Sequence, residues 1–406
     1  MASHIQLNAT TKRISVIDAL RGYALLGVLL THYTSAFSGF PGLLTDEQLA
    51  SLPFPALDHT IFLINQLFFK LKSRVLFSFL FGLGFYFQIK KSERLGIPFR
   101  KSFIKRLLVM LLFGLIHTYL IIWGDILRWY FVAGLFLLVL YRLDSKLILA
   151  LCFLLTVVIP ASESITEMMV TIHHETVFSP EYVQEAFLSG SYWQSIRLNF
   201  LIENERYTDP WYFIGYVSNI LGFFFVGLWA GKVDLFKKLA EYETKIVWSF
   251  FIGILIFAAG TGMYLFNPIS KTESLLWYQI IHSIGYRMNT LGLFMIYLTG
   301  FILIFQKTRL RTYLEVLVPV GKMTLTNYIM QSVVAVLIFN GVGLGLFGKV
   351  GPSFTLPIAL AFFIVQIIFS HVWLHYYYTG PLEWLWRVMV SGKTQPLRKQ
   401  AHHLVK

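Results

Sequence analysis

The chain has 406 residues, of which 56% are hydrophobic and only 14% charged, and its formal net charge is +13. Soluble domains carry about 25% charged residues, so this composition argues against a soluble enzyme and against a disordered chain. Most Lys and Arg residues lie in short segments between long apolar runs, which is typical of a multi-pass membrane protein rather than a nucleic-acid-binding one. The single cysteine, Cys152, lies within an apolar run, so we expect neither an intrachain disulfide nor a cysteine-based metal site.

Ten apolar runs in the sequence are candidates for membrane-spanning helices, each of which needs about 20 mostly apolar residues. In chain order, the predicted spans are 15–37, 60–89, 104–122, 126–141, 146–162, 211–231, 246–266, 277–305, 316–339 and 354–377. The fourth and fifth runs are short for a single crossing, and the second and eighth are long. We therefore expect an all-α, polytopic helical bundle that forms one transmembrane domain over residues 1–406, with no cleavable signal peptide.

The distribution of basic residues predicts how the bundle is oriented. With the N-terminus inside, 23 of the 34 Lys and Arg residues, Arg387 included, fall in cytoplasmic segments. The positive-inside rule then favours an N-in, C-in arrangement with a basic cytoplasmic tail at about 388–406. The longest loop, at about 163–210, would lie outside and is rich in acids, and its stretch 182–200 has the spacing of a helix on the membrane surface or capping the bundle.

Ionisable residues inside predicted spans cost free energy, so each is a candidate functional residue. In the first span, Asp18 and Arg21 are three residues apart and can pair on one helix face. His32 follows Arg21 by eleven residues, close to three turns, which puts both on one face about 16 Å apart along the axis. A cation near the inner surface and a deeper imidazole suit an anionic donor and a proton-abstraction step. Alternatively, the Asp–Arg pair anchors the helix and His32 bonds a backbone carbonyl.

The second apolar run contains three cations, Lys70, Lys72 and Arg74. In one straight helix they would lie near mid-membrane, so we favour a surface or re-entrant segment at about 59–73 followed by a short span. The cations then form an anion-binding rim or extend to the membrane interface.

An acid–base pair is predicted around the end of the third span. His117 lies near its outer end, and Asp125 lies in the short turn that follows. The carboxylate could orient the imidazole as a catalytic dyad, or it could cap the next helix. Two adjacent histidine pairs, at 173–174 and 402–403, lack further ligands, so no metal site is assigned.

The ninth span and the C-terminal region also carry polar candidates. Asn327 and Gln331 are four residues apart and share a helix face, beside Tyr328. These side chains either join helices by hydrogen bonds or line a polar cavity. Glu383 and Arg387 form a further i, i+4 pair beside two tryptophans at a membrane boundary, where they stabilise an interfacial helix or bind substrate.

Six segments together resemble a known family, in family order and over nearly the whole chain. They are Ile17-Asp18-Ala-Leu-Arg21-Gly22, Leu76-Phe-Ser-Phe-Leu-Phe-Gly82, Gly114-Leu-Ile-His117 leading to Gly124-Asp125, Gly190-Ser-Tyr192 with Arg197, Leu325-Thr-Asn327-Tyr328 with Gln331, and Gly380-Pro381-Leu-Glu383-Trp-Leu-Trp386-Arg387. They resemble the YeiB-like membrane proteins of domain of unknown function 418. That family in turn resembles the transmembrane acyltransferase group, which includes the acyltransferase-3 proteins and the lysosomal heparan glucosaminide acetyltransferase.

The resemblance implies a multi-pass protein of the bacterial inner membrane. Members of the acyltransferase group usually move an acyl unit from cytoplasmic acyl-CoA to a sugar or other acceptor. Arg21 and His32 match the Arg and catalytic His that acyltransferase-3 proteins carry eleven residues apart on the first helix. YeiB-like proteins often have Asn at the position of His32, and the His corresponding to His117 is typical of them. Two histidines are therefore candidate catalytic bases.

We therefore expect an acyltransferase-like protein with acyl-CoA as donor and a sugar, lipid or small-molecule acceptor. Arg21 and nearby cations would hold the donor's phosphates, and His117 or His32, oriented by Asp125, would remove the acceptor's proton. The polar group of the ninth span would position the acceptor or stabilise the oxyanion. The other predicted binding residues are Asp18, Lys70, Lys72, Arg74, Asn327, Tyr328, Gln331, Glu383 and Arg387.

The alternative is a transporter of a small anionic or amphipathic solute, which should show two related halves. An acyltransferase should instead show one polar cavity with a basic inner mouth. The expected partners are the lipid bilayer and these small molecules, without nucleic acid; the oligomeric state stays open.

Overall fold

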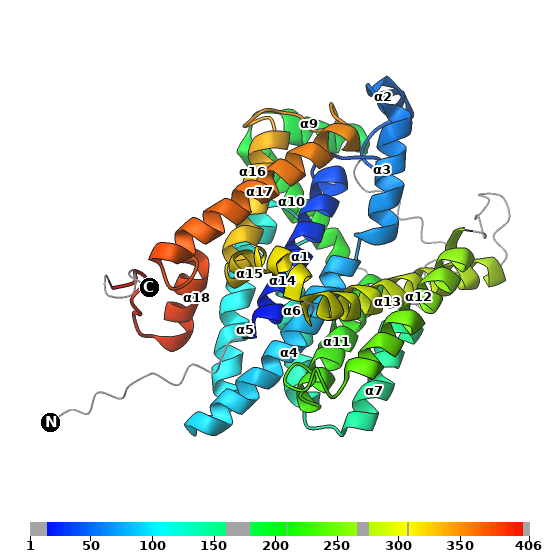
Figure 1. The fold of residues 1–406 in the computed structure, drawn as a ribbon. Coiled ribbons are helices and arrows are strands. Elements are labelled where there is room, and N and C mark those ends of the chain that lie inside the picture. The colour runs from blue at the N-terminus through cyan, green and yellow to red at the C-terminus, as the bar shows by residue number, and fades with distance from the viewer. Residues whose placement is uncertain (1–13, 160–178, 209, 266–275, 307, 401–406) are drawn as a thin grey trace.

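The computed structural model describes residues 14–159, 179–208, 210–265, 276–306 and 308–400 (Figure 1). These residues are helical, apart from loops and one isolated antiparallel bridge between Tyr377 and Arg398. The predicted all-α fold is thus confirmed. Part of the predicted loop at about 163–210, the histidine pairs at 173–174 and 402–403, and the end of the tail at 388–406 lie outside the described residues.

The helices follow one another with mostly short connections. In chain order they are α1 Ser15–Thr31 with its π-helical continuation η1 His32–Ala36, α2 Asp46–Ser51, α3 Pro55–Phe68, α4 Lys72–Leu95, α5 Phe99–Ile116 with η2 His117–Ile121, α6 Leu127–Leu140, α7 Ser145–Phe153 with η3 Leu154–Val158, α9 Pro180–Leu188, α10 Tyr192–Thr208, α11 Pro210–Lys232, α12 Glu243–Leu265, α13 Leu276–Gln306, α14 Thr308–Glu315, α15 Val318–Lys322, α16 Thr324–Phe339, α17 Pro352–Tyr376 and α18 Pro381–Ser391.

Within the described residues, five helices are long and apolar enough to cross a membrane. They span Phe99–Ile121, Tyr212–Lys232, Glu243–Leu265, Ile280–Gln306 and Pro352–Tyr376, and three shorter apolar helices span Leu127–Leu140, Ser145–Val158 and Thr324–Phe339. On α12, Leu255 is 70% exposed and Trp248 64% exposed, a surface that suits lipid rather than water. The chain is therefore a membrane protein.

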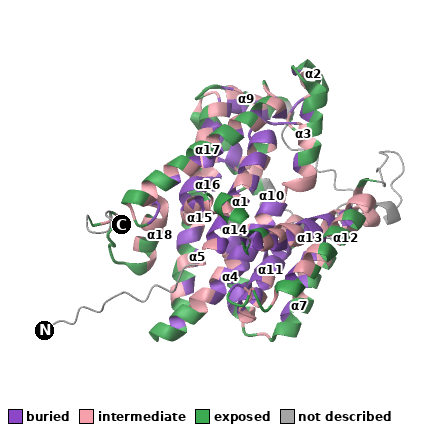
Figure 2. Ribbon diagram, viewed as in Figure 1, coloured by how far each residue is buried: buried purple, intermediate pink, exposed green. Residues whose placement is uncertain are grey.

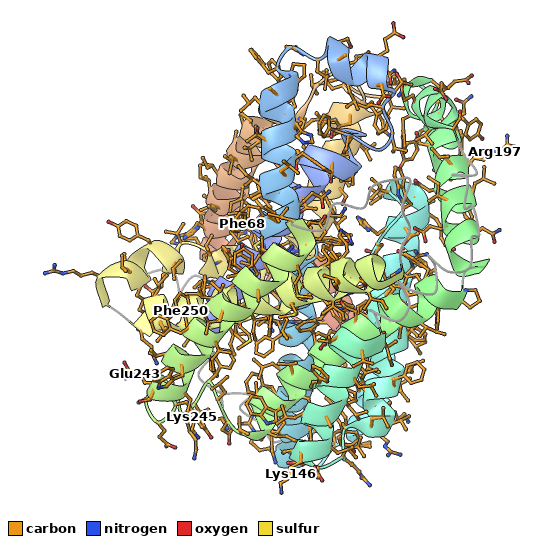
Figure 3. The ribbon with its side chains drawn as sticks, turned by 90° about the vertical axis from the view of Figure 1, so that its right-hand side faces the viewer. Phe68, Lys146, Arg197, Glu243, Lys245 and Phe250 are labelled. Carbon is orange, nitrogen blue, oxygen red and sulfur yellow. The ribbon has the colours of Figure 1, made fainter. Side chains whose placement is uncertain are left out.

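Burial is concentrated in the middle of the bundle. Figure 2 shows buried residues along α1, α4 and α11, whereas α7, α12 and α18 present exposed faces. Figure 3 shows Lys146, at the start of α7, and Lys245, in the first turn of α12, at one end of the molecule, with Arg197 of α10 towards the other end. The connections that end at Lys146 and Lys245 thus lie at the same end of the molecule.

The second predicted span is broken into two helices. α3 ends at Phe68 and α4 begins at Lys72, and between them Leu71 has a left-handed backbone with φ of 66°. Figure 1 shows α3 descending from one end of the bundle to its middle, where α4 takes over. The Lys72 ammonium is fully buried and donates to the Gln66 carbonyl at 2.9 Å, which satisfies a carbonyl of the last turn of α3. The ninth predicted span is likewise divided, because α15 ends at Lys322 and α16 begins at Thr324.

Glycines let the central helices approach until their backbones touch. A Cβ atom on Gly82 of α4 would lie 1.9 Å from the Phe224 carbonyl oxygen of α11, and one on Gly227 of α11 would lie 2.0 Å from that of Phe79. A Cβ atom on Gly321 of α15 would lie 1.7 Å from the Asp18 carbonyl oxygen of α1. Small residues commonly allow such close packing between helices in membranes. These contacts position α1, α4 and α15, which carry much of the site below.

Candidate functional site

A cavity of about 810 Å³ lies among α1, α4, α5, α6, α11, α15, α16 and α18. Its wall carries six cationic side chains, from Arg21, Arg74, Lys91, Arg106, Lys322 and Arg387, against one carboxylate of the described residues, that of Glu383. Such a wall produces a positive potential inside a low-dielectric bundle. The cavity reaches the surface beside the exposed residues Lys91 and Gln395.

The pairing of α1 with α4 shows how far the cavity extends inward. The Arg21 guanidinium lies beside Gly84, 4.0 Å from where a Cβ atom of that residue would be, and Gly27 abuts the Ser73 side chain. Lys91, near the end of α4, marks the open end. Arg74 lies ten residues before Gly84, so Arg74 is about 15 Å deeper than Gly84 along the helix axis. The predicted common face of the first span is present, because Arg21 and His32 both line the cavity.

Both candidate histidines occupy the same kind of local structure. His32 begins η1 and His117 begins η2, and their carbonyls accept π-type hydrogen bonds at 2.9 Å from the amides of Phe37 and Ile122. Single π-helical turns inside α-helices are rare and often occur at functional sites. His32 lines the cavity, whereas His117 is only 1% exposed.

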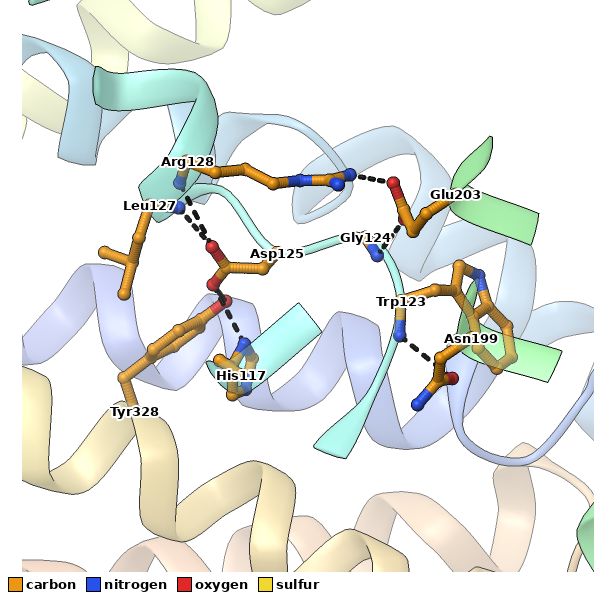
Figure 4. A network of polar contacts seen from close by, with 9 residues as sticks. All are labelled: His117, Trp123, Gly124, Asp125, Leu127, Arg128, Asn199, Glu203 and Tyr328. Atoms are coloured by element: carbon orange, nitrogen blue, oxygen red, sulfur yellow. Dashed lines mark hydrogen bonds and ion pairs between the residues drawn. The ribbon is translucent and has the colours of Figure 1, made fainter. Parts of the chain in front are cut away.

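The Asp125 carboxylate joins three elements (Figure 4). Its Oδ1 lies 2.9 Å from His117 Nδ1 and accepts a hydrogen bond of 3.0 Å from the Tyr328 hydroxyl. Its Oδ2 accepts hydrogen bonds from the amides of Leu127, at 2.6 Å, and Arg128, at 3.3 Å, at the start of α6. Asp125 therefore both pairs with the histidine and caps the next helix, whereas a catalytic role for the pair stays a prediction.

The imidazole of His117 is only partly used by this network. The ring lies 4.9 Å from the Tyr328 ring, and its Nε2 is buried without a hydrogen-bond partner among the described residues. Tyr328 itself lines the cavity. The His117–Asp125 pair thus lies behind the cavity wall, with Tyr328 between this pair and the cavity.

A second buried network fixes the turn that carries Asp125. Helix α10 directs Asn199 and Glu203 at this turn, where the Trp123 amide donates to Asn199 Oδ1 at 3.3 Å and the Gly124 amide donates to Glu203 Oε1 at 2.7 Å. Glu203 also pairs with the Arg128 guanidinium, and both side chains are almost fully buried (Figure 4). Sequence reasoning overlooked this pair, although Arg128 is a cation at the start of an apolar run, three residues after Asp125.

Other predicted binding residues stabilise helix packing. Glu383 lines the cavity, and its carboxylate also accepts hydrogen bonds from the amides of Leu325, at 2.6 Å, and Thr326, at 3.0 Å, and so caps α16. Asn327 bonds Ser370 at 3.0 Å, and Gln331 bonds Gln366 at 2.9 Å, between α16 and α17. The structure therefore places both amides between helices rather than on the cavity wall.

The remaining predicted residues lie near the cavity but outside the part of its wall that the structure describes. Asp18 pairs with Arg21 at 2.8 Å. Lys70 lies in the break between α3 and α4, and Lys72 is turned towards α3. Of the three cations predicted as a rim, Arg74 is the one that reaches the cavity. Among the described residues, no three His, Cys, Asp or Glu side chains form a group that could hold a metal ion.

Comparison with known proteins shows the family. The family described as "Protein of unknown function (DUF418)" matches residues 230–393. The uncharacterised protein YxaH of Bacillus subtilis (strain 168) is 31% identical over 412 residues, which cover 98% of this chain and 99% of that protein. The chain belongs to the DUF418 family.

Two further relatives of this DUF418 protein are similar to it over different lengths. An uncharacterised 39.9 kDa protein in the amylase 3′ region of Bacillus acidopullulyticus is 29% identical over 97% of this chain and 99% of its own. The uncharacterised protein YeiB of Escherichia coli (strain K12) is 38% identical over 79 residues, which are 19% of this chain and 20% of YeiB. No solved structure matches the chain. The predicted YeiB-like family is thus confirmed.

Proposed function

We propose that this protein is a transmembrane acyltransferase that transfers an acyl group from cytoplasmic acyl-CoA to a sugar, lipid or other small acceptor. The observation that carries the proposal is the cavity of about 810 Å³, cationic at its open end, with His32 further along its wall. This volume lies within the range of about 300–1,000 Å³ that small-molecule sites occupy. Cations such as Arg106 and Arg387 would bind the donor's phosphates through charge-assisted hydrogen bonds.

The proposal includes a topology of ten crossings in the bacterial inner membrane, with both termini in the cytoplasm. Each predicted span corresponds to a described helix or to a broken pair such as α3–α4 and α15–α16. Lys146 and Lys245 lie at one end of the molecule, and the positive-inside rule assigns that end to the cytoplasm (Figure 3). The open end of the cavity, beside Lys91, belongs to a connection with the same basic character.

In this mechanism His32 is the general base, because a base must reach the proton that it removes and His32 lines the cavity. The acceptor's oxygen or nitrogen attacks the thioester carbonyl while its proton passes to the imidazole. The carbon–sulfur bond then breaks, and the imidazolium returns the proton to the leaving thiolate. The His117–Asp125 pair holds Tyr328 on the wall, and Asn327 and Gln331 hold its helix in place.

Acyl-CoA binding and hydrolysis by the purified protein test this proposal, with His32→Gln and His117→Gln as matched variants. We expect saturable binding in all three proteins. We expect hydrolysis to fall about 100- to 10,000-fold in His32→Gln, the range for losing a general base, and to fall less in His117→Gln. Loss in His117→Gln alone would move the base to the His–Asp pair. Absence of binding at millimolar acyl-CoA in folded protein would contradict acyl transfer.

A second candidate function is transport of a small anionic or amphipathic solute through the same cavity. The observation that favours it is the pair of broken helices, α3–α4 and α15–α16, because transporters commonly build their substrate sites from discontinuous helices. Uptake of a labelled anion into vesicles, without acyl-CoA binding, would support this function instead.

A further inference from the structure

The cation deepest in the cavity, counted along α4 from the open end, is Arg74. Its guanidinium lies 4.3 Å from the centre of the Tyr216 ring, and one terminal nitrogen donates to Asn219 Oδ1 at 3.3 Å. Its Nε is buried and has no hydrogen-bond partner among the described residues. The guanidinium thus has neutral neighbours, and no described carboxylate forms an ion pair with it.

A buried guanidinium with neutral neighbours is stabilised by a bound anion. Arginine stays charged at every accessible pH, and a charge inside a membrane protein is stable when it is paired or directed into a polar cavity. Two carboxylates in this region bind other residues, since Asp125 binds His117 and Tyr328, and Glu203 binds Arg128. The cavity, which Arg74 and Tyr216 both line, is where a counter-ion can approach.

Arg74 is also separated from the other cations of the wall. It lies about 15 Å beyond the level of Arg21 on α4, and further still from Lys91, so a phosphate held at the open end does not satisfy it. Lys72, two residues earlier, is not available because its ammonium binds the Gln66 carbonyl. Among the described residues of the wall, Arg74 and His32 are therefore the basic groups of the inner part of the cavity.

We propose that Arg74, with Tyr216 and Asn219, forms a subsite for the anionic group of the acceptor, so that the acceptor is a molecule bearing a carboxylate or phosphate. A guanidinium binds either group through two parallel hydrogen bonds, and the Tyr216 ring already holds one of its faces. That this anion belongs to an acceptor of acyl groups rests on the proposed function. The anion subsite itself does not, because a transporter would use it for its solute.

Thermal stability of the purified full-length protein in detergent, titrated with three sugars, tests the subsite. The probes are glucuronate, glucose 6-phosphate and glucose, which present a carboxylate, a phosphate and no charge on one ring. The variants are Arg74→Gln, Arg74→Lys, and Arg100→Gln as a matched control that removes an exposed cation of α5 outside the described cavity wall. Acyl-CoA binding is measured on the same samples.

We expect at least one of the two charged sugars to raise the unfolding temperature saturably, and glucose not to do so. The preferred sugar identifies carboxylate or phosphate as the ligand group. Arg74→Gln should weaken the apparent Kd at least tenfold, Arg74→Lys should keep part of the binding, and Arg100→Gln should leave the apparent Kd within about twofold. Equal stabilisation by glucose, equal loss in Arg74→Gln and Arg100→Gln, or no response to either anion would each overturn the subsite. A normal subsite without acyl-CoA binding would instead contradict the acyltransferase.

Discussion

At the scale of single residues, the buried pair of Arg128 and Glu203 offers a stringent test of the turn that carries Asp125. The two side chains are 3% and 0% exposed, and Glu203 also holds the Gly124 amide. We predict that Glu203→Gln lowers stability by about 3–5 kcal/mol, the cost of breaking a buried ion pair by removing one partner's charge. Thermal unfolding in detergent measures the change.

Glu185→Gln is the matched control for this prediction. Glu185 belongs to the preceding helix, α9, and its side chain is exposed, so the same chemical change there should alter stability by no more than about 0.5 kcal/mol. Equal unfolding temperatures for the two variants would mean that the buried pair does not hold the turn.

Contacts within one helix could be predicted from the sequence, whereas contacts between distant helices could not. Arg21 and His32 were predicted to share a face because both belong to one helix, where the 3.6-residue period decides orientation. The Arg128–Glu203 pair joins residues 75 positions apart, on helices whose contact the sequence does not display. The positions of Asn327 and Gln331 between helices, rather than on the cavity wall, depend in the same way on α17.

At the scale of helices, the contact between α4 and α11 can be tested with two glycines of α4. A Cβ atom on Gly82 would overlap the backbone of α11, 1.9 Å from the Phe224 oxygen, whereas one on Gly84 would meet its nearest neighbour at 4.0 Å. We predict that Gly82→Ala destabilises the protein by about 1–3 kcal/mol, because two packed helices must separate.

The same substitution at Gly84 should be neutral or stabilising, by up to about 1 kcal/mol, because alanine favours a helix over glycine. Unfolding temperatures of the two variants provide the comparison. If Gly82→Ala proves as stable as Gly84→Ala, the two helices do not pack as closely as the structure has them.

Helices were predictable to the extent that their signal is local. Apolar runs gave the apolar helices, and the charges at 70–74 indicated that the second run is not one straight helix. The exact break has a different origin, since the left-handed backbone at Leu71 is supported by the contact of Lys72 with α3. The division between α15 and α16 was missed, because Met323, where the helix breaks, is neither a proline nor a glycine.

At the scale of the whole molecule, the cavity could not be derived from the sequence. Its wall takes residues from eight helices, and its positive character arises only when α1, α4, α5, α15 and α18 come together. What the sequence does predict is an orientation, because the positive-inside rule depends only on which connections are basic. The function proposed above depends on that orientation, since acyl-CoA must meet the open end of the cavity in the cytoplasm.

Cysteine labelling of intact cells tests the orientation directly. In a Cys152→Ala background, which removes the native thiol, Glu47→Cys places a cysteine on α2 and Glu93→Cys places one near Lys91, both at exposed positions. We predict that a membrane-impermeant maleimide labels Glu47→Cys in intact cells and labels Glu93→Cys only after the membrane is permeabilised. The reverse pattern would mean that the cationic opening faces away from the cytoplasm, on the side of the membrane where acyl-CoA is not present. Transport would then be the function that this cavity supports.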